Sequence, residues 1–205
     1  MKIIVYTPES RVEREIELIA GMLSAGADYL YLRRQGEDDA YWMAYAEQLP
    51  FADQGKIFTS SFRVLHEMGL DGFHFTGKAI AGLDKQDLVE NLKMLEQSGK
   101  KSSATVRSLE ELQQLDGHLD ILLFSPVFES ISKPGYRQDR NLEALKDYLQ
   151  KRTSKTAVFA QGGINFDRIE EVKSLGFDGI ALLGALWVRS GPVMSDFEKI
   201  VAKCR

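Results

Sequence analysis

A regular alternation of short apolar runs with longer amphipathic runs extends along the whole chain and constrains the fold more than any other feature. Apolar residues recur at helical spacing between the short runs, as they do at Ile16, Ile19, Ala20 and Leu23. Strands that alternate with helices in this way form parallel βα units. The runs expected to be strands are residues 2–6, 29–33, 56–60, 72–76, 102–106, 120–128, 156–164 and 179–187.

Eight such units in 205 residues predict an α/β protein with a single domain, a (β/α)8 TIM barrel covering residues 1–205. Several of the runs are apolar throughout, as expected for strands that are covered on both faces. A doubly wound open sheet has the same local pattern and is the alternative architecture. No linker or low-complexity stretch divides the chain.

Composition excludes several classes of function. The formal net charge is −4, whereas nucleic-acid binders usually carry a basic excess. The single cysteine, Cys204, allows no internal disulfide, and the apolar run before Pro8 is too short for a signal peptide or a membrane span. We therefore expect a cytoplasmic protein with no nucleic-acid or membrane partner.

The aromatic helix expected at 38–49 packs either on the barrel or on a second subunit, so a homodimer is possible.

In a barrel of this type the site lies where the strands end. Hydroxyls, glycines and cations dominate these positions, and carboxylates are nearly absent, which suits an anion such as phosphate. The glycines after the last two strands occupy the usual phosphate position of the fold, although plain turns also use glycine. The expected rim consists of Arg33, Arg34, Gln35, Thr59, Ser60, His74, Thr76, Thr105, Arg107, Ser130, Ser132, Lys133, Gly162, Gly163 and Gly184.

Taken in order, these segments resemble the thiamine phosphate synthase family, which includes the TenI-type thiazole tautomerases. The resemblance runs from the second strand to the eighth. Its motifs correspond here to Tyr31–Gln35, Leu70–His74, Ser125–Lys133, Gly162–Ile164 and Leu183–Gly184.

The resemblance implies a transferase of thiamine biosynthesis. It would join hydroxymethylpyrimidine diphosphate to thiazole phosphate and release pyrophosphate, so its partners would be small phosphorylated heterocycles. Arg33 and Lys133 would be catalytic and hold the diphosphate, and Thr105 would lie near the pyrimidine. The thiazole phosphate site would be lined by Ser130, Ile131, Ser132, Gly163, Leu183 and Gly184, and Tyr31, Gln35, Thr59 and His74 are further candidates for substrate contacts.

The chain also departs from the family pattern at positions that matter for chemistry. The family binds Mg²⁺ through two aspartates, and their positions hold Ser60 and Ala79, so we assign no metal ligand. Gln35 occupies the position of the lysine in the family's motif on the second strand. Arg107 occupies the position of the histidine in the tautomerases. An arginine stays protonated and is a poor general base.

Three hypotheses follow: a synthase, a tautomerase-like isomerase, or a non-catalytic paralogue that binds phosphorylated thiamine precursors. His74 either moves a proton in such an isomerase or is a packed, hydrogen-bonded residue of the barrel wall.

Overall fold

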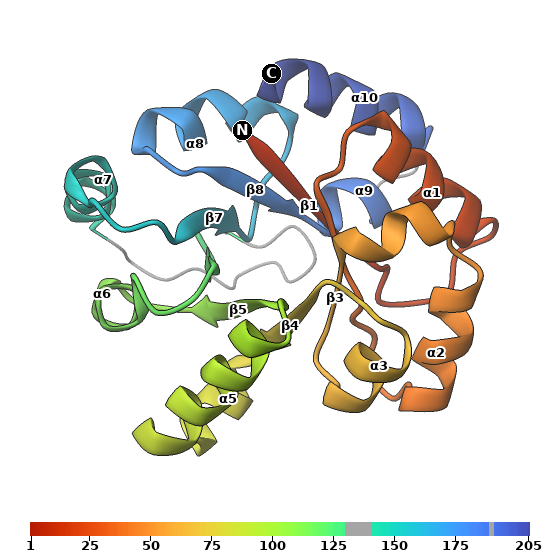
Figure 1. Cartoon of the computed structure of the whole chain (residues 1–205). Coiled ribbons are helices and arrows are strands. Elements are labelled where there is room, and N and C mark those ends of the chain that lie inside the picture. The colour runs from red at the N-terminus through yellow and green to blue at the C-terminus, as the bar shows by residue number, and fades with distance from the viewer. Residues whose placement is uncertain (130–140, 189–190) are drawn as a thin grey trace.

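A computed structural model describes residues 1–129, 141–188 and 191–205 and shows a closed barrel of parallel strands (Figure 1). Neighbouring strands pair in chain order, and β8 closes the barrel against β1 with Ile3 opposite Ile180. This closure confirms the TIM barrel and excludes the open sheet. The strands are β1 (Lys2–Tyr6), β2 (Tyr29–Tyr31), β3 (Ile57–Thr59), β4 (Gly72–Phe75), β5 (Lys101–Val106), β6 (Ile121–Phe124), β7 (Ala157–Gln161) and β8 (Gly179–Leu182).

Helices surround the barrel and connect successive strands (Figure 1). Side-chain caps begin several of them: Asp38 accepts a hydrogen bond from the backbone N–H of Tyr41, and Ser108 accepts one from that of Glu111. The α-helices are α1 (Glu15–Ala25), α2 (Asp39–Glu47), α3 (Phe62–Glu67), α4 (Gly77–Gly82), α5 (Lys85–Gln97), α6 (Leu109–Leu115), α7 (Leu142–Lys151), α8 (Ile169–Leu175), α9 (Gly184–Trp187) and α10 (Val193–Cys204), with 3-10 turns η1 (Phe51–Lys56) and η2 (Phe166–Arg168).

Several of the apolar runs leave the sheet before the ends we expected, and two of them by four residues or more. The run 179–187 divides into β8 and the short helix α9, and the run 120–128 leaves the sheet after Phe124. An apolar run alone does not distinguish a strand from a buried helical turn, so the change at the rim was not visible in the sequence. Two helices, α4 and α5, follow β4 in succession.

Apolar side chains form two clusters on the two faces of the barrel wall. The larger cluster lies between the strands and the helices. The smaller one fills the interior, where Gly72 and Gly179 leave space for the rings of Phe58 and Phe159. A Cβ at either glycine would lie 2.3 Å from the facing ring. The interior cluster consists of Ile4, Tyr6, Tyr31, Phe58, Ile121, Leu123, Phe159 and Ala181.

An aspartate precedes every second strand, at the end of the barrel opposite the rim. Asp28, Asp120 and Asp178 each accept a hydrogen bond of 2.8 Å from a backbone N–H of the strand before, namely Ile3, Ser102 and Val158. Asp71 instead pairs with Lys101. These carboxylates tie neighbouring strands together far from the cavity described below.

The aromatic helix α2 packs on its own barrel. Trp42 and Tyr45 are 7% and 4% exposed, so these rings are buried within one chain. The homodimer stays a prediction. Within the described ranges, no helix combines the length and the apolar character needed to cross a membrane.

Candidate active site

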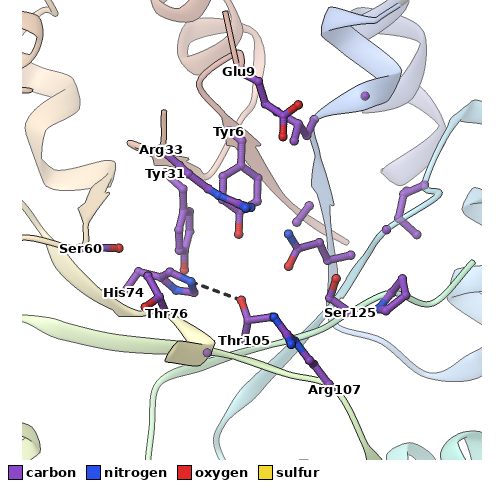
Figure 2. Close-up of a pocket in the computed structure, with 18 of the residues that line it drawn as sticks. Tyr6, Glu9, Tyr31, Arg33, Ser60, His74, Thr76, Thr105, Arg107 and Ser125 are labelled. Atoms are coloured by element: carbon purple, nitrogen blue, oxygen red, sulfur yellow. Dashed lines mark hydrogen bonds between the residues drawn. The ribbon is translucent and has the colours of Figure 1, made fainter. Parts of the chain in front are cut away.

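A cavity of about 520 Å³ opens at the carboxyl ends of the strands (Figure 2). Its volume falls in the range of small-molecule sites. Residues from or directly after every strand line it: Tyr6, Glu9, Tyr31, Leu32, Arg33, Ser60, His74, Thr76, Gly77, Thr105, Arg107, Ser125, Pro126, Gln161, Gly162, Gly163, Ile164, Ala181, Leu183 and Gly184.

The cavity brings together most of the expected site residues that the structure describes. Three of them do not line it: Thr59, Gln35 and Arg34, the last of which is described below. Thr59 is buried and accepts a hydrogen bond of 3.2 Å from the backbone N–H of Ser61, while its neighbour Ser60 takes the lining position; Gln35 is exposed in the turn after β2. The expected residues that do line it are Tyr31, Arg33, Ser60, His74, Thr76, Thr105, Arg107, Gly162, Gly163, Leu183 and Gly184, whereas Ser130, Ile131, Ser132 and Lys133 lie outside the described residues.

The two consecutive arginines after β2 have different environments. Arg34 is 8% exposed and donates hydrogen bonds of 2.6 and 2.7 Å to the two carboxylate oxygens of Glu15 on α1. Its Nε donates to the carbonyl of Pro8, and the Tyr45 hydroxyl donates to Glu15. Arg34 is therefore a buried structural residue, and our expectation that both arginines face the rim is wrong.

Arg33 is the arginine of this pair that faces the cavity (Figure 2). Its backbone N–H donates to Thr7 Oγ1 at 2.9 Å, and the Thr7 hydroxyl donates back to the Arg33 carbonyl at 2.8 Å. The guanidinium lies 5.9 Å from the centre of the Tyr6 ring and has no carboxylate partner in the described part of the chain. The backbone is thus fixed while the charge stays available to a ligand.

His74 is held neutral at the base of the cavity. The Ser103 hydroxyl donates to the Phe73 carbonyl, so it accepts from Nδ1–H of His74 at 3.0 Å. The remaining nitrogen, Nε2, then accepts from the Thr105 hydroxyl at 3.3 Å (Figure 2, dashed line). Burial and the nearby Arg33 charge lower the pKa of His74 to about 3. His74 is therefore packed and hydrogen-bonded in the barrel wall, as in the second of the two alternatives that the sequence left open.

The paired glycines after β7 are required by close packing. Gly162 and Gly163 have φ angles of 89° and 68°, in the left-handed region that favours glycine. A Cβ at Gly163 would lie 2.4 Å from the carbonyl oxygen of Glu129, and one at Gly162 would lie 2.7 Å from Cα of Pro126. The pair therefore allows the chain that follows β6 to lie directly against the end of β7.

Comparison with known proteins identifies the family. Residues 3–186 match the family model described as thiamine monophosphate synthase. The chain belongs to this family. A thiamine-phosphate synthase from Listeria welshimeri is 28% identical over 142 residues, which span 68% of this chain and 62% of the relative. One from Psychrobacter sp. is 24% identical over 184 residues, which span 86% of this chain and 82% of the relative.

Solved structures named as thiamine phosphate pyrophosphorylases have the same fold. The one from Bacteroides thetaiotaomicron has a TM-score of 0.78 and 25% identity, covering 99% of this chain and 97% of its own. The one from Pyrococcus furiosus has a TM-score of 0.77 and 21% identity, covering 99% and 95%. The likeness thus includes essentially the whole barrel.

The residues present do not fit the Mg²⁺ site that the family resemblance implies. Ser60 lines the cavity with a hydroxyl, and Ala79 lies in α4 with its backbone N–H bonded to Thr76 Oγ1. Glu9 is the one carboxylate that the described lining contains, and no cluster of three His, Cys, Asp or Glu side chains occurs among the described residues. Mg²⁺ in proteins is usually held by one or two carboxylates together with substrate phosphates.

Sequence reasoning missed several lining residues. Tyr6 and Gln161 are the last residues of β1 and β7, and Glu9 follows β1 closely. The rule that strand ends form the site would have found all three, but no motif drew attention to β1.

Burial raises the pKa of Tyr6 to about 12, so its hydroxyl stays protonated. Tyr31 Oη and Gln161 Oε1 are buried, and neither makes a hydrogen bond of standard geometry within the described part of the chain.

Proposed function

We propose that this protein is a thiamine-phosphate synthase that joins hydroxymethylpyrimidine diphosphate to thiazole phosphate. The bond between the pyrimidine methylene carbon and the diphosphate oxygen breaks, and its electron pair leaves with pyrophosphate. The thiazole nitrogen supplies its lone pair for the new carbon–nitrogen bond, so no oxidant or net proton transfer is needed. One observation carries the proposal: in a chain of this family, the unpaired Arg33 guanidinium faces the same cavity as the neutral His74–Thr105 pair.

Arg33 would act on the leaving group. A departing diphosphate gains negative charge in the transition state, and a guanidinium held in place stabilises that charge without reorganising. The two hydrogen bonds to Thr7 fix the Arg33 backbone at the rim. Lys133, which lies outside the described residues, is proposed as the second cation on the diphosphate.

Thr105 would orient the pyrimidine. Its hydroxyl proton is engaged by His74 Nε2, so the oxygen offers its lone pairs to the cavity. A lone-pair acceptor at this position selects a ligand donor such as the exocyclic amino group of an aminopyrimidine. The thiazole phosphate would lie against Gly163, Leu183 and Gly184, together with Ser130, Ile131 and Ser132.

The tautomerase alternative lacks the family's histidine, and the described cavity lining offers Glu9 as its one carboxylate. His74 has a pKa of about 3 and both of its nitrogens are engaged, while Arg107 stays protonated. The non-catalytic paralogue shares the phosphate-binding half of the proposal and differs only in turnover.

The test is incubation of the protein with both substrates, with and without Mg²⁺, followed by detection of thiamine phosphate and pyrophosphate. We expect product from the wild type and a loss of about 10²–10³-fold in kcat for Arg33→Gln. The control is Arg63→Gln on α3, because Arg63 pairs with Glu67 at the surface, away from the cavity lining. Absence of product at high enzyme concentration, with thiazole phosphate still raising the melting temperature, would leave the non-catalytic binder instead.

A further inference from the structure

A second arginine without an ion-pair partner among the described residues faces the cavity. Arg107 follows β5, and its backbone N–H donates to Glu111 Oε2 at 2.7 Å, which anchors the residue at the start of α6. The carboxylate of Glu111 is thus engaged by the backbone. The Arg107 guanidinium itself has neither an ion pair nor a hydrogen bond within residues 1–129, 141–188 and 191–205.

The guanidinium of Arg107 lies against the turn that the family uses for metal binding. A Cβ built on Gly77 would lie 3.7 Å from Nη2 and 3.9 Å from Cζ and Nε, so the group packs against the first residue of α4. Ala79, at the position of a family aspartate, lies two residues further along that helix. A fixed positive charge therefore adjoins the place where the family resemblance puts a divalent cation.

The barrel topology places the two free guanidinium groups on either side of the same strand ends. Arg33 follows β2 and Arg107 follows β5, with the ends of β3 and β4 between them (Figure 2). Those intervening ends present the hydroxyl of Ser60 and the turn at Thr76 and Gly77, and they carry no carboxylate. Glu9, the carboxylate of the lining, follows β1, which is opposite β5 in the closed barrel.

We propose that Arg107 and Arg33 form a clamp that binds a diphosphate without a metal ion. The inference rests on the same site as the proposed function and specifies how its anionic substrate is held. A guanidinium is permanently charged and presents two N–H groups to two phosphate oxygens, so a pair of them neutralises charge that Mg²⁺ would otherwise offset. The missing carboxylates are then consistent with the rest of the site, because carboxylates at β3 and β4 would repel the ligand and pair with the arginines.

The experiment measures the binding of inorganic pyrophosphate by calorimetry in excess EDTA and again with Mg²⁺. We expect the wild type to bind in EDTA with an affinity within about threefold of that in Mg²⁺, and Arg107→Gln to weaken binding in EDTA by about 10- to 100-fold. Arg107→Lys keeps the charge but loses the paired donors, so an intermediate affinity is expected. Arg63→Gln is the matched control, and urea unfolding verifies that each variant folds.

Either of two results overturns the clamp: pyrophosphate binding that disappears in EDTA, or an unchanged affinity in Arg107→Gln. The product assay separates this failure from failure of the proposed function. Metal-free binding that depends on Arg107, without formation of thiamine phosphate, supports the clamp and removes the synthase. Product formed only with Mg²⁺ and at full rate in Arg107→Gln supports the synthase and removes the clamp.

Discussion

His74 illustrates how single residues in this cavity derive their chemistry from contacts. Ser103 and Thr105 engage its two ring nitrogens, and the edge of the ring meets Tyr31 with the centroids 5.2 Å apart. A charged imidazole would be buried and would face the Arg33 guanidinium, which disfavours it. The neutral ring and its two hydroxyl partners thus form one hydrogen-bonded group at the base of the cavity.

The depressed pKa of His74 makes stability depend on pH. The unfolded chain binds a proton on this residue below about pH 6.5, whereas the folded chain does so only near pH 3. The free energy of unfolding should therefore fall by about 1.4 kcal/mol per pH unit as the pH drops through this window. His74→Gln lacks the effect. We therefore expect the difference in free energy of unfolding between the wild type and His74→Gln, measured by urea unfolding, to narrow by about 2 kcal/mol from pH 7.5 to pH 5.

The exposed His66 provides the control for this measurement. His66→Gln should follow the wild-type stability at both pH values. Parallel curves for the wild type and His74→Gln would contradict the assigned protonation state.

At the scale of elements, one buried ion pair joins three segments near the rim. Arg34 follows β2, Glu15 begins α1, and Tyr45 of α2 donates to Glu15 at 2.7 Å. Both charged side chains are less than a tenth exposed. The pair fixes the start of α1 against the chain after β2, immediately next to Arg33.

Removing one member of this pair should cost more than removing both. Arg34→Met leaves a buried carboxylate without its partner, and we expect it to lower the free energy of unfolding by about 3–5 kcal/mol. Glu15→Leu should cost a similar amount, and the double variant should be clearly more stable than the sum of the two predicts, as measured by urea unfolding.

The pair Arg14–Glu17 at the start of α1 is the matched control, because both side chains are largely exposed. Arg14→Met and Glu17→Leu should each change the free energy of unfolding only slightly, and their effects should be additive in the double variant. Additive losses for Arg34 and Glu15 would mean that their charges are not coupled.

The whole molecule depends on filling the barrel interior to the correct volume. Gly72 of β4 lies opposite Phe58 of β3, and Gly179 of β8 lies opposite Phe159 of β7. In both pairs the ring occupies the space of the missing side chain, and protein interiors tolerate little excess volume. Closure of the barrel thus restricts the size of the side chain at both positions of each pair.

We expect Gly72→Ala to destabilise the protein and Phe58→Leu to relieve part of that loss, with an offset of about 1–3 kcal/mol in the double variant. The three atoms nearest to a Cβ at Gly72 all belong to the Phe58 ring, the nearest at 2.3 Å. Gly179→Ala with Phe159→Leu should recover less, because the Lys2 carbonyl oxygen would also lie 2.6 Å from the new methyl group. Thermal and urea unfolding of the two double variants measure the difference, and equal recovery would contradict this account.

Local signals in the sequence predicted much of this architecture. Asp38 and Ser108 are residues that favour the first position before a helix, and both cap helices here. The alternation of apolar runs predicted the eight strands, which pair in chain order. Most of the candidate site could be read from strand ends for the same reason. The prediction was wrong for Arg34, because nothing in the residues around it indicates the carboxylate of Glu15, nineteen positions earlier.

The sequence by itself determined the alternation of strands and helices along the chain, and it predicted a barrel whose strand ends meet at one rim. These properties depend on periodicity and capping, which each segment carries locally. Only the tertiary structure decided which arginine is buried, which proton His74 carries, and why Gly163 must lack a side chain. Those outcomes depend on burial and on partners from distant segments, which exist only after the chain has folded.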